Sequence, residues 1–187
     1  MSAAPVILFI GTSLTAGYGL DDPEQAYPAL IQKKVEAEGL RYRVVNAGVS
    51  GETSAGALRR IEWLLRQPVA VLVLETGAND GLRGQDAEAL RANVREILGY
   101  AKARRPAPKL VLVGMRALTN YGKEYGQRLE SIYPEVAREA GAALVPFLLE
   151  GVAGVASLNQ ADGVHPTAEG QKKMAETVWA VLRPLLG

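Results

Sequence analysis

The sequence predicts an α/β fold in which a parallel sheet lies between two layers of helices. Two observations lead to this prediction: short β-branched segments alternate with longer amphipathic ones, and most of the short segments are continuously apolar. Continuously apolar strands are typical of sheets buried on both faces, and strands that alternate with helices indicate parallel pairing. With 187 residues, 48% of them hydrophobic, the chain can bury a substantial core, so we expect residues 1–187 to form a single domain.

Five short segments are predicted as strands: Val6–Ile10, Tyr42–Asn46, Ala70–Leu74, Leu110–Gly114 and Ala143–Phe147. Apolar side chains spaced three and four residues apart predict the helices, which are Gln25–Glu38, Ser54–Gln67, Asp86–Arg104, Tyr125–Ala140 and Ala168–Leu185. Ligands of such sheets bind beyond the carboxyl ends of the strands. The polar, Gly-rich segments that follow each strand are therefore the candidates for a functional site.

The amino-acid composition argues against several classes of function and of catalytic chemistry. The 21 Lys and Arg residues nearly balance the 20 Asp and Glu residues, which gives no support for nucleic-acid binding. The absence of Cys excludes disulfides and thiolate nucleophiles, and with one His a zinc site would need mostly carboxylate ligands, which is uncommon. We therefore expect no metal and no organic cofactor.

No apolar run approaches the roughly 18 residues that suggest a membrane span, so we expect no stable membrane insertion. The apolar segment Val6–Ile10 is interpreted as the first strand rather than as a signal peptide, because no basic residues precede it. These residues alone leave the compartment open. We expect a monomer that acts on a small molecule.

The lone histidine, His165, suggests hydroxyl-based nucleophilic catalysis, which needs a base near neutral pH. Asp162 stands three residues upstream, and its carboxylate can reach the imidazole if Gly163 lets the chain turn. Such a bond fixes the tautomer and stabilises the imidazolium. The alternative is a surface or capping histidine, since Pro166 and Thr167 resemble the start of a helix.

Ser13 directly follows the first predicted strand, where its hydroxyl would lie near amides that favour developing negative charge. It also fits a helix N-cap. Ser50 is a rival nucleophile, but a G-x-S-x-G elbow would need Gly where Glu52 stands, which argues against an ordinary α/β-hydrolase. We predict Ser13 as the nucleophile, with His165 as its base and Asp162 as the group that orients His165.

An acyl-transfer transition state also needs donors for an oxyanion. Gly51, after the second strand, offers an open backbone N–H, and Asn79, after the third, offers a side-chain amide. With the N–H of Ser13 they would make a hole of three donors. Each also fits a turn, Gly51 through a positive φ and Asn79 through its local hydrogen bonding.

These segments together resemble the sequence blocks of the SGNH/GDSL hydrolases, in the same order. GTSLTAGYGL, NAGVSGETS, LETGANDGLRG and DGVHP most resemble the bacterial thioesterase I/lysophospholipase L1/arylesterase group. The resemblance implies a flavodoxin-like α/β/α fold with five parallel strands in the order 2-1-3-4-5. It also implies hydrolysis of esters or thioesters through an acyl-enzyme, and a periplasmic or exported enzyme, with a cytoplasmic one as the alternative.

Several positions depart from this pattern. The family's Asp before the nucleophile is Thr12 here, Thr76 and Ala78 stand where Leu and Gly are more usual, and residues 117–119 replace a Pro-containing stretch.

Apolar side chains in the loops after strands three and four suggest a substrate groove, formed by Leu82, Ala117, Leu118 and Tyr121. We expect short to medium acyl or aryl esters as substrates, with weaker activity on thioesters and lysophospholipids. The alternatives are a carbohydrate O-acetylesterase of the same fold and a non-hydrolytic flavodoxin-like binding domain.

Overall fold

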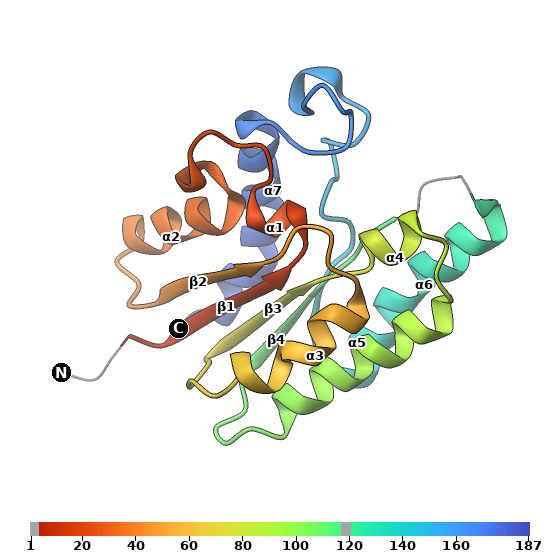
Figure 1. The fold of residues 1–187 in the computed structure, drawn as a ribbon. Coiled ribbons are helices and arrows are strands. Elements are labelled where there is room, and N and C mark those ends of the chain that lie inside the picture. The colour runs from red at the N-terminus through yellow and green to blue at the C-terminus, as the bar shows by residue number, and fades with distance from the viewer. Residues whose placement is uncertain (1–3, 117–120) are drawn as a thin grey trace.

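A computed structural model describes residues 4–116 and 121–187 (Figure 1). Its centre is a sheet of five parallel strands in the order β2-β1-β3-β4-β5, which confirms the expected strand order. The strands are β1 (Val6–Gly11), β2 (Arg43–Gly48), β3 (Val71–Glu75), β4 (Lys109–Val113) and β5 (Ala143–Val145).

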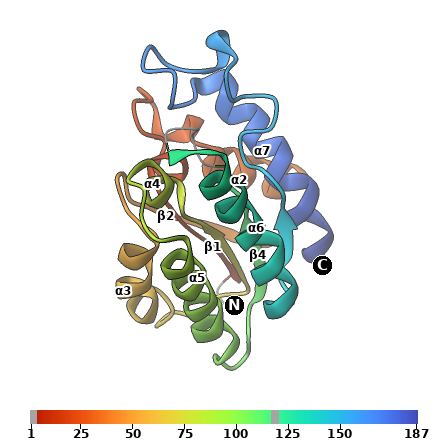
Figure 2. The same cartoon turned by 90° about the vertical axis from the view of Figure 1, so that its right-hand side faces the viewer.

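The central strands of the sheet are buried because helices cover both of its faces (Figures 1 and 2), whereas the edge strand β2 is partly exposed. One face carries α2 (Tyr27–Ala37) and α7 (Ala168–Leu182), and the other carries α3 (Ser54–Leu64), α5 (Ala87–Lys102) and α6 (Lys123–Ala140). Every residue of β1 and of β3 is buried, as their continuously apolar sequences predict. The α/β/α fold is therefore the one expected.

Several predicted elements end earlier in the structure, and prolines limit three of them. Pro68 disfavours a helical conformation at Gln67, so α3, which ends at Leu64, does not reach Gln67 as predicted, and α7 gives way at Arg183 to a 3₁₀ turn that contains Pro184. Strand β5 ends at Val145 because Pro146 has no N–H with which to extend the ladder. Helix α2 starts two residues later than predicted, after a separate 3₁₀ turn, η1 (Pro23–Gln25).

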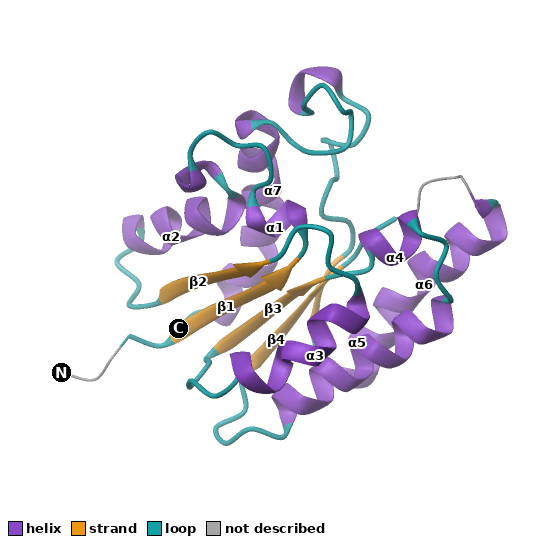
Figure 3. Cartoon of the chain, viewed as in Figure 1, coloured by secondary structure: helices purple, strands orange, loops and turns teal. Residues whose placement is uncertain are grey.

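Two short helices that the sequence patterns do not predict lie at the carboxyl edge of the sheet (Figure 3). They are α1 (Ser13–Ala16), directly after β1, and α4 (Ala78–Leu82), directly after β3. Since β1 and β3 are hydrogen-bonded neighbours, these helices begin close to each other. They carry Ser13 and Asn79, so the fold itself brings two predicted site residues to one edge.

Candidate active site

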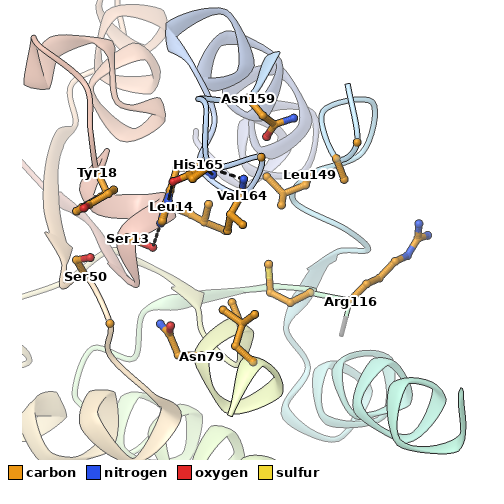
Figure 4. A pocket seen from close by; sticks show the side chains of 18 residues that line it. Ser13, Leu14, Tyr18, Ser50, Asn79, Arg116, Leu149, Asn159, Val164 and His165 are labelled. Carbon is orange, nitrogen blue, oxygen red and sulfur yellow. Dashed lines mark hydrogen bonds and ion pairs between the residues drawn. The ribbon is translucent and has the colours of Figure 1, made fainter. Parts of the chain in front are cut away.

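Ser13, His165 and Asp162 form a hydrogen-bonded chain (Figure 4). The imidazole Nε2 of His165 lies 3.0 Å from Ser13 Oγ, and its Nδ1 lies 2.7 Å from Asp162 Oδ2. Both distances are within hydrogen-bond range, so a proton can pass from the hydroxyl to the imidazole while the carboxylate holds the opposite ring nitrogen.

The turn 162–165 is built around the Asp162 carboxylate. Its Oδ1 accepts the backbone N–H groups of Val164 and His165, each at 2.9 Å. Gly163 permits the turn because its φ is +70°, a conformation that other residues rarely adopt. The backbone N–H of His165, together with the imidazole and the Val164 N–H, lowers the pKa of Asp162 to about 2. The carboxylate is therefore ionised at any pH near neutrality.

Helix α1 presents Ser13 at its first position. Thr12 is the N-cap, with its side chain accepting from the N–H of Leu14, and Gly17 closes the helix in a left-handed conformation with φ +77°. The first N–H groups of a helix have no intrahelical acceptor, so the Ser13 amide is available to a ligand. Ser13 itself is partly buried and lines a cavity.

Asn79 and Gly51 line the same cavity as Ser13. The Asn79 Nδ2 donates to the carbonyl of Glu52 at 2.8 Å, which fixes the amide and leaves its second N–H for a ligand. Gly51 has φ +80°, and its carbonyl accepts from Arg83 at 3.0 Å. The loop that contains Gly51 is thus tied to the loop after α4, and the three predicted oxyanion donors come to one cavity.

The cavity has a volume of about 470 Å³ and is lined mainly by apolar groups. Tyr18 and Ser50 lie on one side of Ser13 in Figure 4, and Leu149 and Arg116 lie on the other. The rival nucleophile Ser50 therefore also borders the cavity, but it is Ser13 that the imidazole contacts.

The four residues predicted to form the substrate groove differ in where the structure places them. Leu82 lines the cavity. Tyr121 is not among the lining residues, which corrects its predicted place. Its ring packs against Gly84 because that glycine has no side chain, and its hydroxyl donates to the Leu82 carbonyl at 3.4 Å. Ala117 and Leu118 lie outside the described residues.

Sequence reasoning missed several residues of the cavity wall. The Tyr18 ring lies 4.6 Å from the imidazole of His165, measured between ring centroids, although Tyr18 is 53% exposed. Apolar lining side chains come from separate segments, namely Leu14, Met115, Leu149 and Val164. The one signal in the sequence was an aromatic residue, Tyr18, five positions after the predicted nucleophile. The apolar lining residues could not be predicted without the geometry of the loops that carry them.

Within residues 4–116 and 121–187, no group of three or more His, Asp or Glu side chains is placed to hold a metal ion. In that same part of the chain, no helix has both the length and the apolar character that crossing a bilayer requires.

Comparison with known proteins identifies the family of the chain. The model of the GDSL-like lipase/acylhydrolase family matches residues 9–173, which include all of the cavity-lining positions. The chain belongs to this family. It is thus an SGNH-type carboxylic ester hydrolase, as its sequence blocks indicated.

Members of this GDSL-like family resemble the chain over nearly its full length. Esterase TesA of Pseudomonas aeruginosa is 44% identical over 186 residues, covering 99% of this chain and 91% of that protein. Thioesterase 1/protease 1/lysophospholipase L1 of Escherichia coli is 38% identical over 187 residues, covering 99% and 86%. A crystal structure of TesA is similar with a TM-score of 0.90 at 44% identity, covering 97% of this chain and 99% of that one.

Proposed function

We propose that this GDSL-type esterase hydrolyses short to medium acyl or aryl esters through an acyl-enzyme on Ser13. The observation that carries the proposal is the chain of hydrogen bonds from Asp162 through His165 to Ser13, at the wall of a mainly apolar cavity. We also propose that residues 1–187 form one domain, since all five strands belong to one sheet, and that the chain acts as a monomer.

In the first half of the reaction, Ser13 Oγ attacks the ester carbonyl carbon and His165 Nε2 takes the hydroxyl proton. The carbonyl oxygen gains negative charge, which the N–H groups of Ser13 and Gly51 and the Asn79 amide stabilise. The tetrahedral intermediate collapses, and His165 gives its proton to the departing alcohol or phenol. An acyl group is then bound to Ser13 through an ester bond.

In the second half, His165 takes a proton from water, and the resulting hydroxyl group attacks the acyl carbon. The second tetrahedral intermediate uses the same donors. Its collapse returns the proton to Ser13 Oγ and releases the carboxylic acid. Asp162 stays ionised throughout, holds Nδ1 and stabilises the imidazolium in both halves.

The apolar wall supports an acyl or aryl group as the occupant of the cavity. Leu14, Met115, Leu149 and Val164 supply this wall, and burying each CH₂ of a substrate is worth about 0.8 kcal/mol. The volume of about 470 Å³ falls within the range of small-molecule sites. The name of the Escherichia coli relative supports thioesters and lysophospholipids as further substrates.

The test is a profile of kcat/KM over p-nitrophenyl esters from acetate to palmitate, together with acyl-CoA thioesters, a lysophospholipid and an acetylated xylan. We expect a maximum at short to medium chains and lower values for thioesters and lysophospholipid. Activity confined to acetylated polysaccharide would favour an O-acetylesterase instead. A profile flat across chain lengths would contradict the apolar-cavity proposal and leave the serine mechanism standing.

A further inference from the structure

A buried polar cluster lies directly behind the turn that carries Ser13. Its members are Thr12, Thr15, Tyr27 and Glu75, all at most 1% exposed. Glu75 is the last residue of β3, and Thr12 follows the last residue of the neighbouring strand β1. The mechanism proposed above uses none of these side chains.

Three donors converge on the Glu75 carboxyl group. The backbone N–H of Thr12 donates to Oε2 at 2.7 Å, the Thr12 hydroxyl lies 3.0 Å from the same oxygen, and the Thr15 hydroxyl donates to it at 2.9 Å. Thr12 and Thr15 flank Ser13 in the turn and in the first turn of α1. One carboxyl group thus binds the chain on both sides of the nucleophile.

The residues around the Glu75 carboxyl group leave space for it and extend its hydrogen-bond network. A Cβ atom on Gly11 would lie 2.7 Å from Glu75 Oε2 and 2.0 Å from Thr15 Oγ1, so the absence of a side chain there opens the path. The Tyr27 hydroxyl lies 2.8 Å from Thr15 Oγ1 and extends the network into α2. Burial raises the pKa of Glu75, and the hydrogen bonds from Thr12 and Thr15 oppose that rise.

A buried carboxyl group is costly unless its hydrogen bonds are made, and here they all go to the turn that carries Ser13. Apolar residues fill the neighbouring positions of β3, so packing alone would favour an apolar residue at position 75. We therefore attribute the presence of a glutamate at position 75 to its hydrogen bonds with Thr12 and Thr15.

We propose that Glu75 is a positioning residue for Ser13, and that the hydroxyl of Thr12 completes its clamp. The hydroxyl of Thr12 donates to Glu75 and accepts from the N–H of Leu14, so it links the carboxyl group to the start of α1. An Asp at position 12 would instead place two carboxyl groups together, and one of them would have to be protonated. This proposal rests on the proposed role of Ser13 as nucleophile.

The experiment compares Thr12→Val, which keeps the shape but loses the hydroxyl, with Thr12→Ser, which keeps the hydroxyl. Val35→Ala, a buried position in α2 away from the cavity, is the control for lost stability without a lost clamp. For each variant, kcat and KM are measured on one p-nitrophenyl ester, with the labelling rate of Ser13 by a fluorophosphonate and the Tm. If Thr12→Val does not fold, Glu75→Gln takes its place in the same comparison.

Thr12→Val should lower kcat and the labelling rate by about tenfold or more with KM changed by less than about threefold, because small displacements of a nucleophile are costly. Thr12→Ser should restore most of the activity, and Val35→Ala should keep kcat despite a lower Tm. Wild-type kcat in Thr12→Val, or equal losses in Thr12→Val and Val35→Ala, would overturn the proposal. Full activity in Ser13→Ala would instead overturn the proposed function.

Discussion

The Nε2 of His165 lies 3.0 Å from the Oγ of Ser13, although 152 residues separate them in the chain. Ser13 begins α1 at the carboxyl end of β1, and His165 stands just before α7, which packs with α2 on the same face of the sheet. The catalytic geometry thus depends on the docking of the C-terminal helix against the N-terminal part of the fold. The predictions below follow from this arrangement.

Loss of the Asn79 amide should affect the reaction more than substrate binding. Asn79→Ala is expected to lower kcat by roughly 10²–10³, with a smaller change in KM, because the amide stabilises charge that develops in the transition state. Steady-state kinetics on a p-nitrophenyl ester measure both constants. Asn79→Asp is the matched variant: it keeps the size, but its negative charge should cost at least as much. A rise in KM with kcat unchanged would mean that Asn79 only binds substrate.

The Tyr18 ring should contribute through its contact with His165. In the proposed mechanism the imidazole becomes cationic, and an aromatic ring stabilises a nearby cation by about 0.5–1 kcal/mol at an exposed site. Tyr18→Ala should therefore lower kcat by about two- to fivefold, whereas Tyr18→Phe, which keeps the ring, should stay near wild type. If Phe and Ala variants lost equal activity, the phenol hydroxyl rather than the ring would be responsible.

Asp162 should make stability depend on pH in a defined window. Its pKa in the folded protein is about 2, below the ordinary value of about 3.9, so the unfolded chain binds the proton first. The stabilisation is complete above about pH 4 and is lost as pH falls through about 2. The Tm difference between wild type and Asp162→Asn should therefore shrink from pH 5 to pH 2. A difference that stays constant or grows on acidification would contradict the assignment.

A larger side chain in the apolar wall of the cavity should shorten the preferred acyl chain. Leu149→Trp is expected to lower kcat/KM for octanoyl and longer esters by about tenfold, which corresponds to about two excluded methylene groups, while acetyl esters keep their rate. Val155→Trp places the same ring on an exposed position of the following loop and serves as the control. An equal effect of Leu149→Trp on all chain lengths would place the acyl group elsewhere.

The architecture followed from the sequence because the determining signals were local. Continuously apolar segments such as Ala70–Leu74 could only be buried between helix layers, and prolines limited several elements. Ser13, Asn79 and Asp162 could be predicted as site residues because each follows a strand or stands at a fixed spacing from the only histidine. The early ends of α3 and α7 were foreseeable from Pro68 and Pro184.

The rest of the site depended on tertiary packing. Tyr121 was expected in the substrate groove because it follows strand four, but the side chain of Tyr121 fills the space over Gly84. Leu149 and Val164 enter the cavity from loops whose paths have no periodic pattern. In the sequence, Glu75 is a single polar residue at the end of a strand and carries no further signal. Its position behind Ser13 is evident only from the structure, where Thr12 and Thr15 donate hydrogen bonds to it.

The central claim is that Ser13 is the nucleophile, and covalent labelling tests it most directly. A fluorophosphonate reacts with an activated serine, and mass spectrometry of the digested protein locates the modified residue. We predict that wild type is labelled at Ser13 and loses esterase activity in proportion, that Ser50→Ala is labelled like wild type, and that Ser13→Ala is neither labelled nor active. Labelling at Ser50, or ester hydrolysis by Ser13→Ala at the wild-type rate, would contradict the account.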